Sequence, residues 1–352
     1  MTITQQTTIN EIAREAGVSK QTVSRVLNNR PDVSLETRQK VQAIIDRTGY
    51  QPSEIALSLA RGHTSTIGII CSGIQHYGST QILAGMEEQA NVLRYSMSLS
   101  LIQKSEDHQV ETILRKYIAQ RVAGIIWAVI TKIGDRHQRD MAKLEGLRVP
   151  TVIRGQPHPG LTTVDTDNFA GATLATQHLI AQGYQTIGII LGAPEDWSAN
   201  QCLKGWQSAL QSANIPPDKN LVVEGDWSSS SGAMGLKTLL DQRPDADAVF
   251  ASNDQMALGA LHAAQLLRRR VPQDLGVVGY NDVPDARFFT PALSTIRTDL
   301  MEMGRVLVQE LDHIVQAGRF EEACEVRSIV IPPKLVARSS SSRLLVLEPI
   351  SS

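Results

Sequence analysis

The chain has 352 residues, of which 42% are hydrophobic and 20% are charged, and its formal net charge is −2. That length exceeds what one compact core supports and predicts two or three domains, while the composition is that of an ordinary soluble globular protein. No apolar run approaches the roughly 20 residues that span a bilayer, and the polar residues 1–10 lack the layout of a signal peptide. We therefore expect a cytoplasmic protein that does not use a membrane.

The charge is distributed unevenly along the chain. The first 61 residues carry two more basic than acidic side chains, whereas the remainder carries four more acidic than basic ones. A basic end on an acidic body is typical of a DNA-binding segment attached to a solvated domain. The imbalance is small, so it supports this interpretation without deciding it.

The cysteines show no pattern for binding metal. Cys71, Cys202 and Cys324 are isolated from one another in sequence and form no pair at metal or redox spacing. We expect reduced thiols that serve as small apolar residues. With no phosphate-binding glycine loop and no His/Cys cluster, the sequence predicts neither a cofactor nor a metal.

Short helices are predicted near the N-terminus. Thr8 and Glu11 fit a capping box, and Gly17 ends the first helix because glycine enters the left-handed conformation at little cost. Ser19 can cap a second helix, and a third is expected over Ser34–Gly49. Two short helices joined by a tight glycine turn form the helix-turn-helix arrangement.

The exposed face of the second predicted helix is rich in hydrogen-bonding side chains. These are Lys20, Gln21, Thr22, Ser24 and Arg25. The N-terminal part of such a helix enters the major groove of DNA, where Arg25 can hold a guanine edge with two bonds and Gln21 an adenine edge. A merely solvated face of a small three-helix bundle remains an alternative at this point.

Residues 51–61 link this segment to the body. Pro52 suits the first turn of a helix, but so short a helix does not fold alone. The apolar Leu57 and Leu59 make it unlike a polar linker. We expect a hinge helix that folds on the duplex and inserts a leucine between base steps from the minor groove.

The segment INEIAREAGVSKQTVSRVLNNRPDVSLETRQKVQAIIDRTGYQPSEIALSLARG resembles the headpiece and hinge of the lactose/galactose repressor (LacI/GalR) family. The resemblance implies that Lys20, Gln21 and Arg25 read bases. It assigns phosphate contacts to Ser19, Thr22, Ser24 and Asn28. It also makes Leu59 the intercalating residue and Ala56 its companion in the minor groove. Ser53 departs from the asparagine that is frequent in the family.

From Thr66 onward the chain alternates strand-like and helix-like segments. The strands are expected at Ile67–Cys71, Leu99–Ile102 and Gly124–Ile130, and the helices at Thr80–Leu93 and Val110–Gln120. Such alternation predicts parallel sheets with helices on both faces. The sequence Thr66–Ile70 recurs unchanged as Thr186–Ile190, followed by a helix at Asn200–Ala213, which predicts two similar α/β lobes around a cleft.

The resemblance continues through the body to about Ser340, in SNDQMALGALHAA, VGYNDVPDARFFTPALSTIRTD and PPKLVARSS, and EGDWSSSSG is similar to its sugar-responsive members. It implies an α/β core of the periplasmic-binding-protein type, with two Rossmann-like parallel sheets, behind an all-α helix-turn-helix headpiece. The chain is expected to cross between the lobes three times. The expected divisions are a headpiece at 1–50, a hinge helix at 51–61, a core at 62–340 and a tail at 341–352. Within the core, lobe 1 takes 62–164 plus 294–325, and lobe 2 takes 165–293 plus 326–340.

Loops at the carboxyl ends of the strands should line the cleft. Sugar sites combine aromatic faces with fixed polar groups, so we expect Trp227, and secondly Trp197, to stack on a ligand, although packing of the lobes is the alternative for each. Asn253 can offer an amide, and Asp254 is expected to cap the following helix. Asn200 and Asn281 are expected to hydrogen-bond the ligand as well, and His76 and Tyr77, in the first lobe's opening loop, could close the site from the other side.

The cleft departs from the family pattern at several positions. Asn200 stands five residues before the pair Gly205–Trp206, where an arginine is common, and Asn281 follows Gly279–Tyr280, where an aspartate is common. Both changes remove charge-assisted hydrogen bonds. Arg154 stands where an apolar residue is common, and it leaves an anionic ligand possible beside the neutral sugar that we favour.

Together these features predict a transcriptional regulator, a repressor by family analogy, and not an enzyme. Its partners would be a palindromic operator, a second copy of the chain and a small effector, and no membrane. A homodimer is expected because one helix-turn-helix reads only half of a palindrome, and the tail is too short for the heptads of a tetramer. A transporter's solute-binding protein and a sugar-converting enzyme are the alternatives; the DNA-binding head argues against the first, and the missing acid–base constellation against the second.

Overall fold

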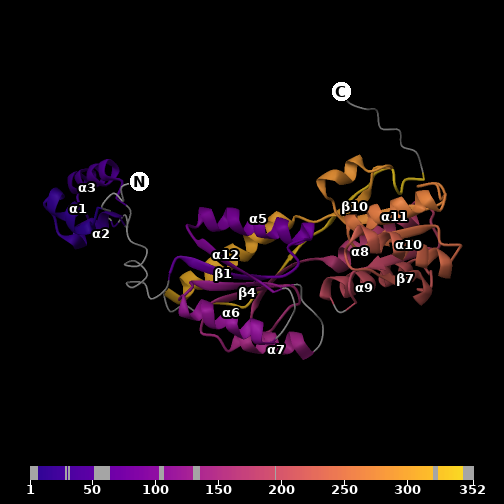
Figure 1. Ribbon diagram of the computed structural model, residues 1–352, viewed down its shortest axis with the longest axis horizontal. Coiled ribbons are helices and arrows are strands. Elements are labelled where there is room, and N and C mark those ends of the chain that lie inside the picture. The colour runs from indigo at the N-terminus through magenta and orange to yellow at the C-terminus, as the bar shows by residue number, and fades with distance from the viewer. Residues whose placement is uncertain are drawn as a thin grey trace, which may run out of the picture. The chain divides into compact units, whose positions relative to one another are not determined.

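The computed structural model describes residues 7–27, 30, 32–50, 64–102, 107–129, 135–194, 196–319 and 324–343. The chain separates into two compact units, Met1–Ser65 and Thr66–Ser352, which are drawn in Figure 1 and described separately below. The expected hinge helix with Ala56 and Leu59, as well as Asn28, lies outside the described residues. Within these residues, no helix is long and apolar enough to cross a membrane.

The N-terminal unit is the predicted three-helix bundle. Its helices are α1 (Ile9–Ala16), α2 (Lys20–Leu27) and α3 (Leu35–Thr48). The capping box is present, since the Glu11 N–H donates to the Thr8 hydroxyl and the Thr8 N–H donates to the Glu11 carboxylate over 2.7 Å. The left-handed Gly17, at φ 67°, ends α1, as predicted. Apolar side chains from all three helices, Ile12, Val23 and Val41 among them, are fully buried, so local signals and a small core agree.

The first lobe of the larger unit is a parallel six-stranded sheet with the order β11-β5-β4-β3-β1-β2. Its strands are β1 (Thr66–Cys71), β2 (Ser96–Leu101), β3 (Gly124–Ala128), β4 (Thr151–Arg154), β5 (Thr162–Thr166) and β11 (Ser328–Ile331). Helices α5 (Tyr77–Val92) and α12 (Leu300–Arg319) cover one face, and α6 (Asp107–Ala119) and α7 (Asp135–Glu145) the other (Figure 1). The fully buried β1 and β3 are continuous apolar runs, as expected for a sheet covered on both faces.

The second lobe repeats this plan. Its sheet has the order β12-β10-β9-β8-β6-β7, with β6 (Ile187–Leu191), β7 (Val222–Glu224), β8 (Ala248–Ala251), β9 (Gly276–Asn281), β10 (Ser294–Arg297) and β12 (Lys334–Val336). Helices α8 (Asn168–Ala181) and α9 (Trp197–Ser212) pack together, as do α10 (Ser229–Gln242) and α11 (Asp254–Leu266), and short 3-10 turns lie at η1 (Lys219–Leu221) and η2 (Pro284–Phe288). Among the described strands, β12 alone runs antiparallel to its neighbour, so the prediction of two parallel sheets is confirmed apart from this strand.

The described chain passes between the sheets three times, after β5, after β10 and between β11 and β12. The expected exchange points at residues 294 and 326 are wrong by one strand each. Residues 294–297 form β10 and pair with β9 of the second lobe, and residues 328–331 form β11 and pair with β5 of the first. The chain crosses only after each strand has finished pairing, because an earlier crossing would leave backbone groups of β9 and β5 without hydrogen-bond partners.

Candidate functional site

Helix α2 presents the predicted polar face to solvent. Lys20, Gln21 and Arg25 are exposed, whereas Thr22 and Ser24 are half-buried. The apolar Val23 and Val26 on the opposite side are buried in the headpiece core. The core therefore fixes the rotation of α2 about its axis and holds the polar side chains outward, as base recognition requires.

The start of α2 is held by Ser19. Its hydroxyl accepts a hydrogen bond from the Thr22 N–H over 3.1 Å and lies 2.9 Å from the Thr22 hydroxyl. The predicted cap is thus confirmed, and Ser19 also remains exposed. The Arg25 guanidinium lies 3.5 Å from the Asp32 carboxylate, with both side chains about half exposed. Exposed ion pairs contribute little free energy, so this pair leaves Arg25 able to exchange its partner.

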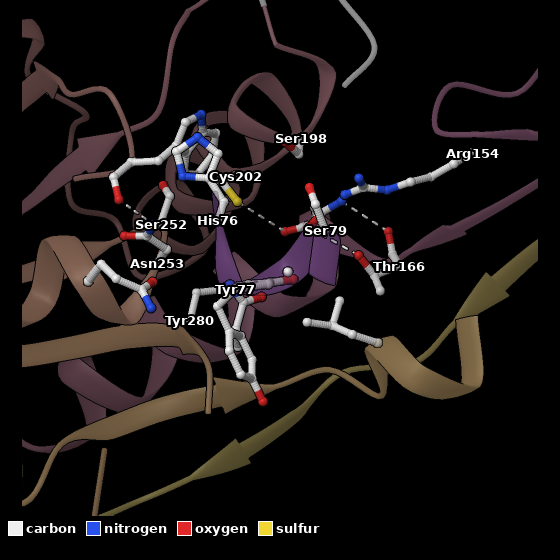
Figure 2. A pocket seen from close by; sticks show the side chains of 16 residues that line it. His76, Tyr77, Ser79, Arg154, Thr166, Ser198, Cys202, Ser252, Asn253 and Tyr280 are labelled. Atoms are coloured by element: carbon white, nitrogen blue, oxygen red, sulfur yellow. Dashed lines mark hydrogen bonds between the residues drawn. The ribbon is translucent and has the colours of Figure 1, made fainter. Parts of the chain in front are cut away.

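A cavity lies between the two lobes of the larger unit, with about 700 Å³ of empty space when the open solvent at its mouth is included. Figure 2 shows side chains from both lobes converging on it. Its lining includes His76, Tyr77, Arg154, Trp227, Asn253 and Asn281 from among the predicted residues. Trp197 and Asn200 do not line it. Both lie in the first turn of α9, which begins at Trp197, three residues earlier than the sequence pattern predicts.

Trp227 lies in the cavity wall in a strained backbone conformation. Its φ is +71°, a value that L-residues rarely adopt. The indole N–H donates to the Asp196 carboxylate over 3.2 Å, and the ring lies so close to Gly192 that a Cβ there would be 1.9 Å from it. The ring is therefore held in one orientation from both ends, which suits a stacking platform.

The expectation that Asp254 caps α11 is wrong, whereas the expected contact of the Asn253 amide with a ligand stays a prediction. Asn253, rather than Asp254, caps α11: its amide oxygen accepts from the Met256 N–H over 2.7 Å, and its amide nitrogen donates to the Trp227 carbonyl over 2.9 Å. Asp254 is fully buried and accepts hydrogen bonds from the Thr295 hydroxyl and the Val283 N–H. Burial raises the pKa of Asp254 to about 7. Both amide atoms of Asn253 thus bond the backbone, which fixes this side chain beside Trp227 in the cavity wall.

Arg154, at the end of β4, faces two carboxylates. Burial lowers the pKa of Arg154, and the nearby Asp165 and Asp196 act in the opposite direction. Burial likewise raises the pKa of Asp165, against the effects of Arg154 and of a hydrogen bond from the Trp197 side chain. The Trp197 side chain thus hydrogen-bonds to Asp165 and is not among the residues that line the cavity. Arg154 thus has two acidic residues, Asp165 and Asp196, within electrostatic range.

His76 and Tyr77 begin α5 and bring the first lobe to the cavity. Burial lowers the pKa of His76, and Asp226 of the second lobe opposes this shift. Burial also raises the pKa of Tyr77, together with Asp254, Asp282 and Asp285. Both side chains thus lie within the electrostatic range of the other lobe, so lobe movement would change their surroundings.

Several lining residues were not predicted from the sequence. They are Gly78, Ser79, Thr166, Asn168, Ser198, Cys202, Ser252, Gln255, Tyr280 and Leu300. Ser198 and Cys202 are four residues apart on α9 and so share one helix face. This spacing indicates that Cys202, rather than Asn200, faces the cavity together with Ser198. Burial raises the pKa of Cys202 to about 12, so the thiol stays protonated. In the part of the chain that the structure describes, no cluster of three or more His, Cys, Asp or Glu side chains fits a metal ion.

Comparisons with known proteins agree with this architecture. Residues 8–53 match the family described as bacterial regulatory proteins, lacI family, and residues 176–341 match the periplasmic binding protein-like domain. The transcriptional repressor PurR of Salmonella newport (strain SL254) is 33% identical over 338 residues, which cover 95% of this chain and 96% of that protein. PurR of Proteus mirabilis (strain HI4320) is 32% identical over the same length and coverage.

Solved structures give the same result. The Lac repressor dimer bound to operator and the anti-inducer ONPF superposes with a TM-score of 0.82 at 31% identity, covering 96% of this chain and 99% of that one. The complex of the transcriptional regulator CelR with cellobiose gives a TM-score of 0.71 at 28% identity, covering 95% of this chain and all of that one. With its helix-turn-helix headpiece and two-lobed core, the chain is therefore a DNA-binding transcriptional regulator that belongs to the lacI family.

Proposed function

We propose that this regulator is a repressor that binds a palindromic operator as a homodimer and is controlled by a neutral sugar in the cleft. The observation that carries the proposal is that one chain presents an outward polar face on α2 and encloses a polar and aromatic cavity between two lobes. In this proposal Lys20, Gln21 and Arg25 contact bases. Phosphates are contacted by Ser19, Thr22, Ser24 and Asn28.

Dimer formation is supported by apolar side chains that the second lobe leaves exposed. Met234 on α10, Leu266 on α11 and Phe288 in η2 are each at least 70% exposed. A second copy of the chain could cover such side chains and remove them from water. Two headpieces are also what a palindrome requires. Sedimentation of the full-length chain should give a dimer, and a monomer or tetramer at micromolar concentration would contradict this part.

The division into a headpiece at 1–50 and a hinge helix at 51–61 is part of the proposal. Leu59 would insert between base steps, with Ala56 beside it in the minor groove. Unstacking occurs only at the central step of a specific site, so Leu59→Ala should weaken binding to the operator far more than binding to unrelated DNA. An equal loss on both duplexes would assign Leu59 to ordinary packing.

A neutral ligand is favoured by the charge of the cavity wall. Arg154 is the positively charged lining residue at neutral pH, and Asp165 and Asp196 lie close enough to offset it. The rest of the wall offers hydroxyls, amides and the Trp227 ring, which suit sugar hydroxyls and the apolar face of a sugar ring. With both amide atoms of Asn253 already bonded, we propose Asn281 as the main amide contact.

Tryptophan fluorescence of the full-length protein tests the ligand class. The titrants are D-glucose, D-galactose, D-ribose, lactose, cellobiose, their phosphates where stable, and adenine, guanine and hypoxanthine. A sugar should change the emission of the wild type but not of Trp227→Phe, whereas Trp127→Phe, a control buried in the first lobe, should keep the response. A response to a nucleobase alone, or to a sugar phosphate alone, would contradict the neutral-sugar proposal.

A further inference from the structure

Two consecutive residues at the rim of the cavity have left-handed backbones. Asn281 has φ +100° and Asp282 has φ +52°, and Asn281 lines the cavity. Non-glycine residues in this region each carry a cost and persist only where their surroundings enforce them. Something other than local preference therefore holds this pair in place.

The carboxylate of Asp282 is the centre of that restraint. One oxygen accepts from Arg297 Nε and the other from Arg338 Nη2, both over 2.7 Å, while the Asp282 side chain is only 6% exposed. Its backbone N–H donates to the Thr295 hydroxyl over 3.3 Å. Removing one partner from such a buried charged group leaves the others uncompensated, so the three side chains act as one unit.

The two arginines lie in the second lobe, next to strands by which the chain leaves or enters that lobe. Arg297 is the last residue of β10, and the chain then passes to α12 of the first lobe. Arg338 follows β12, which the chain enters directly after leaving β11 of the first lobe. The Thr298 hydroxyl, on the first of these crossings, donates to the Asn281 amide oxygen over 3.4 Å. Asp282 thus connects a cavity residue to Arg297, which directly precedes one crossing, and to Arg338, which follows the strand that the chain enters after another.

We propose that Asp282 is a positioning residue that holds Asn281 toward the effector and transmits effector binding to the segments on which the lobes turn. This inference rests on the proposed function, because it assigns a regulatory role at the same cavity. A ligand that engages the Asn281 amide competes with the Thr298 hydroxyl for it. The resulting change reaches Arg297 and Arg338 through the Asp282 carboxylate. Ligand binding therefore shifts the equilibrium between the orientations of the two lobes.

The test compares full-length wild type, Asp282→Asn and Asp274→Asn. Asp274 is the matched control, since it pairs with Arg270 over 2.7 Å in the same lobe and does not line the cavity. Operator affinity is measured by anisotropy on a labelled palindromic duplex selected by the wild type from a random pool, with and without each sugar of the panel. The effective sugar should change wild-type and Asp274→Asn affinity by about 5- to 150-fold. Asp282→Asn should bind the duplex normally without sugar and lose most of this response.

Arg297→Gln guards against misfolding of Asp282→Asn. The Arg297 side chain is 55% exposed, and the Arg338 pair survives its loss, so a partial loss of the response is expected. A full response in both Asp282→Asn and Arg297→Gln would overturn the inference. A wild type whose operator affinity no sugar changes would overturn the proposed function instead.

A ligand-free double-mutant cycle decides the positioning role independently. Asn281→Gly removes the backbone cost at φ +100°, so it should raise the Tm of the wild type by a few degrees. In the Asp282→Asn background the restraint is gone, and the same substitution should give no increase. Equal shifts in both backgrounds would show that Asp282 does not hold Asn281, and would overturn the inference whatever the sugar does.

Discussion

The headpiece and the cleft are built by different kinds of contact. In the headpiece, the stabilising side-chain bonds of Thr8 and Ser19 reach only three residues along the chain. In the cleft, Asn253 bonds a residue 26 positions away, Trp227 one 31 away and Arg338 one 56 away. The side chains that we propose for base contacts, Lys20, Gln21 and Arg25, are exposed on α2. Many polar groups of the cleft are already used by the fold itself.

The largest expected effect concerns the larger unit, where contacts join residues far apart in the sequence. Trp206 is fully buried on α9, and its indole N–H donates to the Ile187 carbonyl over 3.2 Å. Trp206→Ala should lower the free energy of unfolding of the larger unit by about 3–5 kcal/mol. Denaturant unfolding followed by circular dichroism measures it. Ile118→Ala, at a side chain that is 47% exposed, is the control and should change the value little.

Arg25 tests whether the outward face of α2 reads bases. Arg25→Ala should cost about 1–3 kcal/mol of specific binding and remove selectivity at one operator position, while leaving the fold intact, because its pair with Asp32 is exposed. Competition gel shifts on single-base variants of the operator measure the selectivity. Arg47→Ala, which breaks the ion pair with Glu15 on the same bundle, should keep it. Unchanged selectivity in Arg25→Ala would remove this residue from base readout.

A smaller effect is expected in the headpiece, where contacts join residues close together in the sequence. Thr8→Ala removes the capping hydroxyl of α1 and should destabilise the headpiece by about 1 kcal/mol, with little effect on the larger unit. Thr7→Ala changes the neighbouring threonine, which is not the cap residue, and serves as the control. Hydrogen exchange of headpiece amides reports the difference; equal protection in both variants would contradict the capping role.

These differences explain what the sequence predicted. Thr8, Gly17, Ser19 and Gly49 each act within one turn of chain, so their patterns fixed the headpiece helices correctly. The repeat of Thr66–Ile70 and the apolar strands likewise predicted two similar lobes. Local signals of this kind are readable because neighbouring residues supply all the partners.

The cleft was predicted less well because its side chains hydrogen-bond to residues that are far away in the sequence. Nothing near Asn253 shows that the Trp227 carbonyl will occupy its amide. Trp197 is an aromatic residue of the kind that stacks on sugars, yet its side chain hydrogen-bonds to Asp165. The lobe exchange points moved for the same reason, since the pairing of β10 and β11 depends on strands far away in sequence.

The smallest expected effect concerns pH and separates ligand contact from stability. Burial lowers the pKa of both His76 and His178, so each resists protonation in the folded state. As pH falls below about 6.5, these two histidines become protonated in the unfolded chain but stay neutral in the folded chain. The free energy of unfolding therefore declines. His76 lines the cavity, whereas His178 is not among its lining residues, so sugar affinity should also weaken at low pH. His76→Gln should flatten this dependence of sugar affinity on pH, and His178→Gln should leave it unchanged. Isothermal titration between pH 7.5 and pH 5.5 measures it, and an unchanged profile in His76→Gln would contradict its place at the ligand.

The most direct measurement is binding of the full-length chain to its selected palindrome while the sugar panel is titrated in, with stoichiometry read from the same complexes. The account predicts two chains per palindrome, much weaker binding to a scrambled duplex, and a change of operator affinity of about five-fold or more with one neutral sugar. Equal affinity for the palindrome and the scrambled duplex, or an operator affinity that no sugar changes, would contradict it.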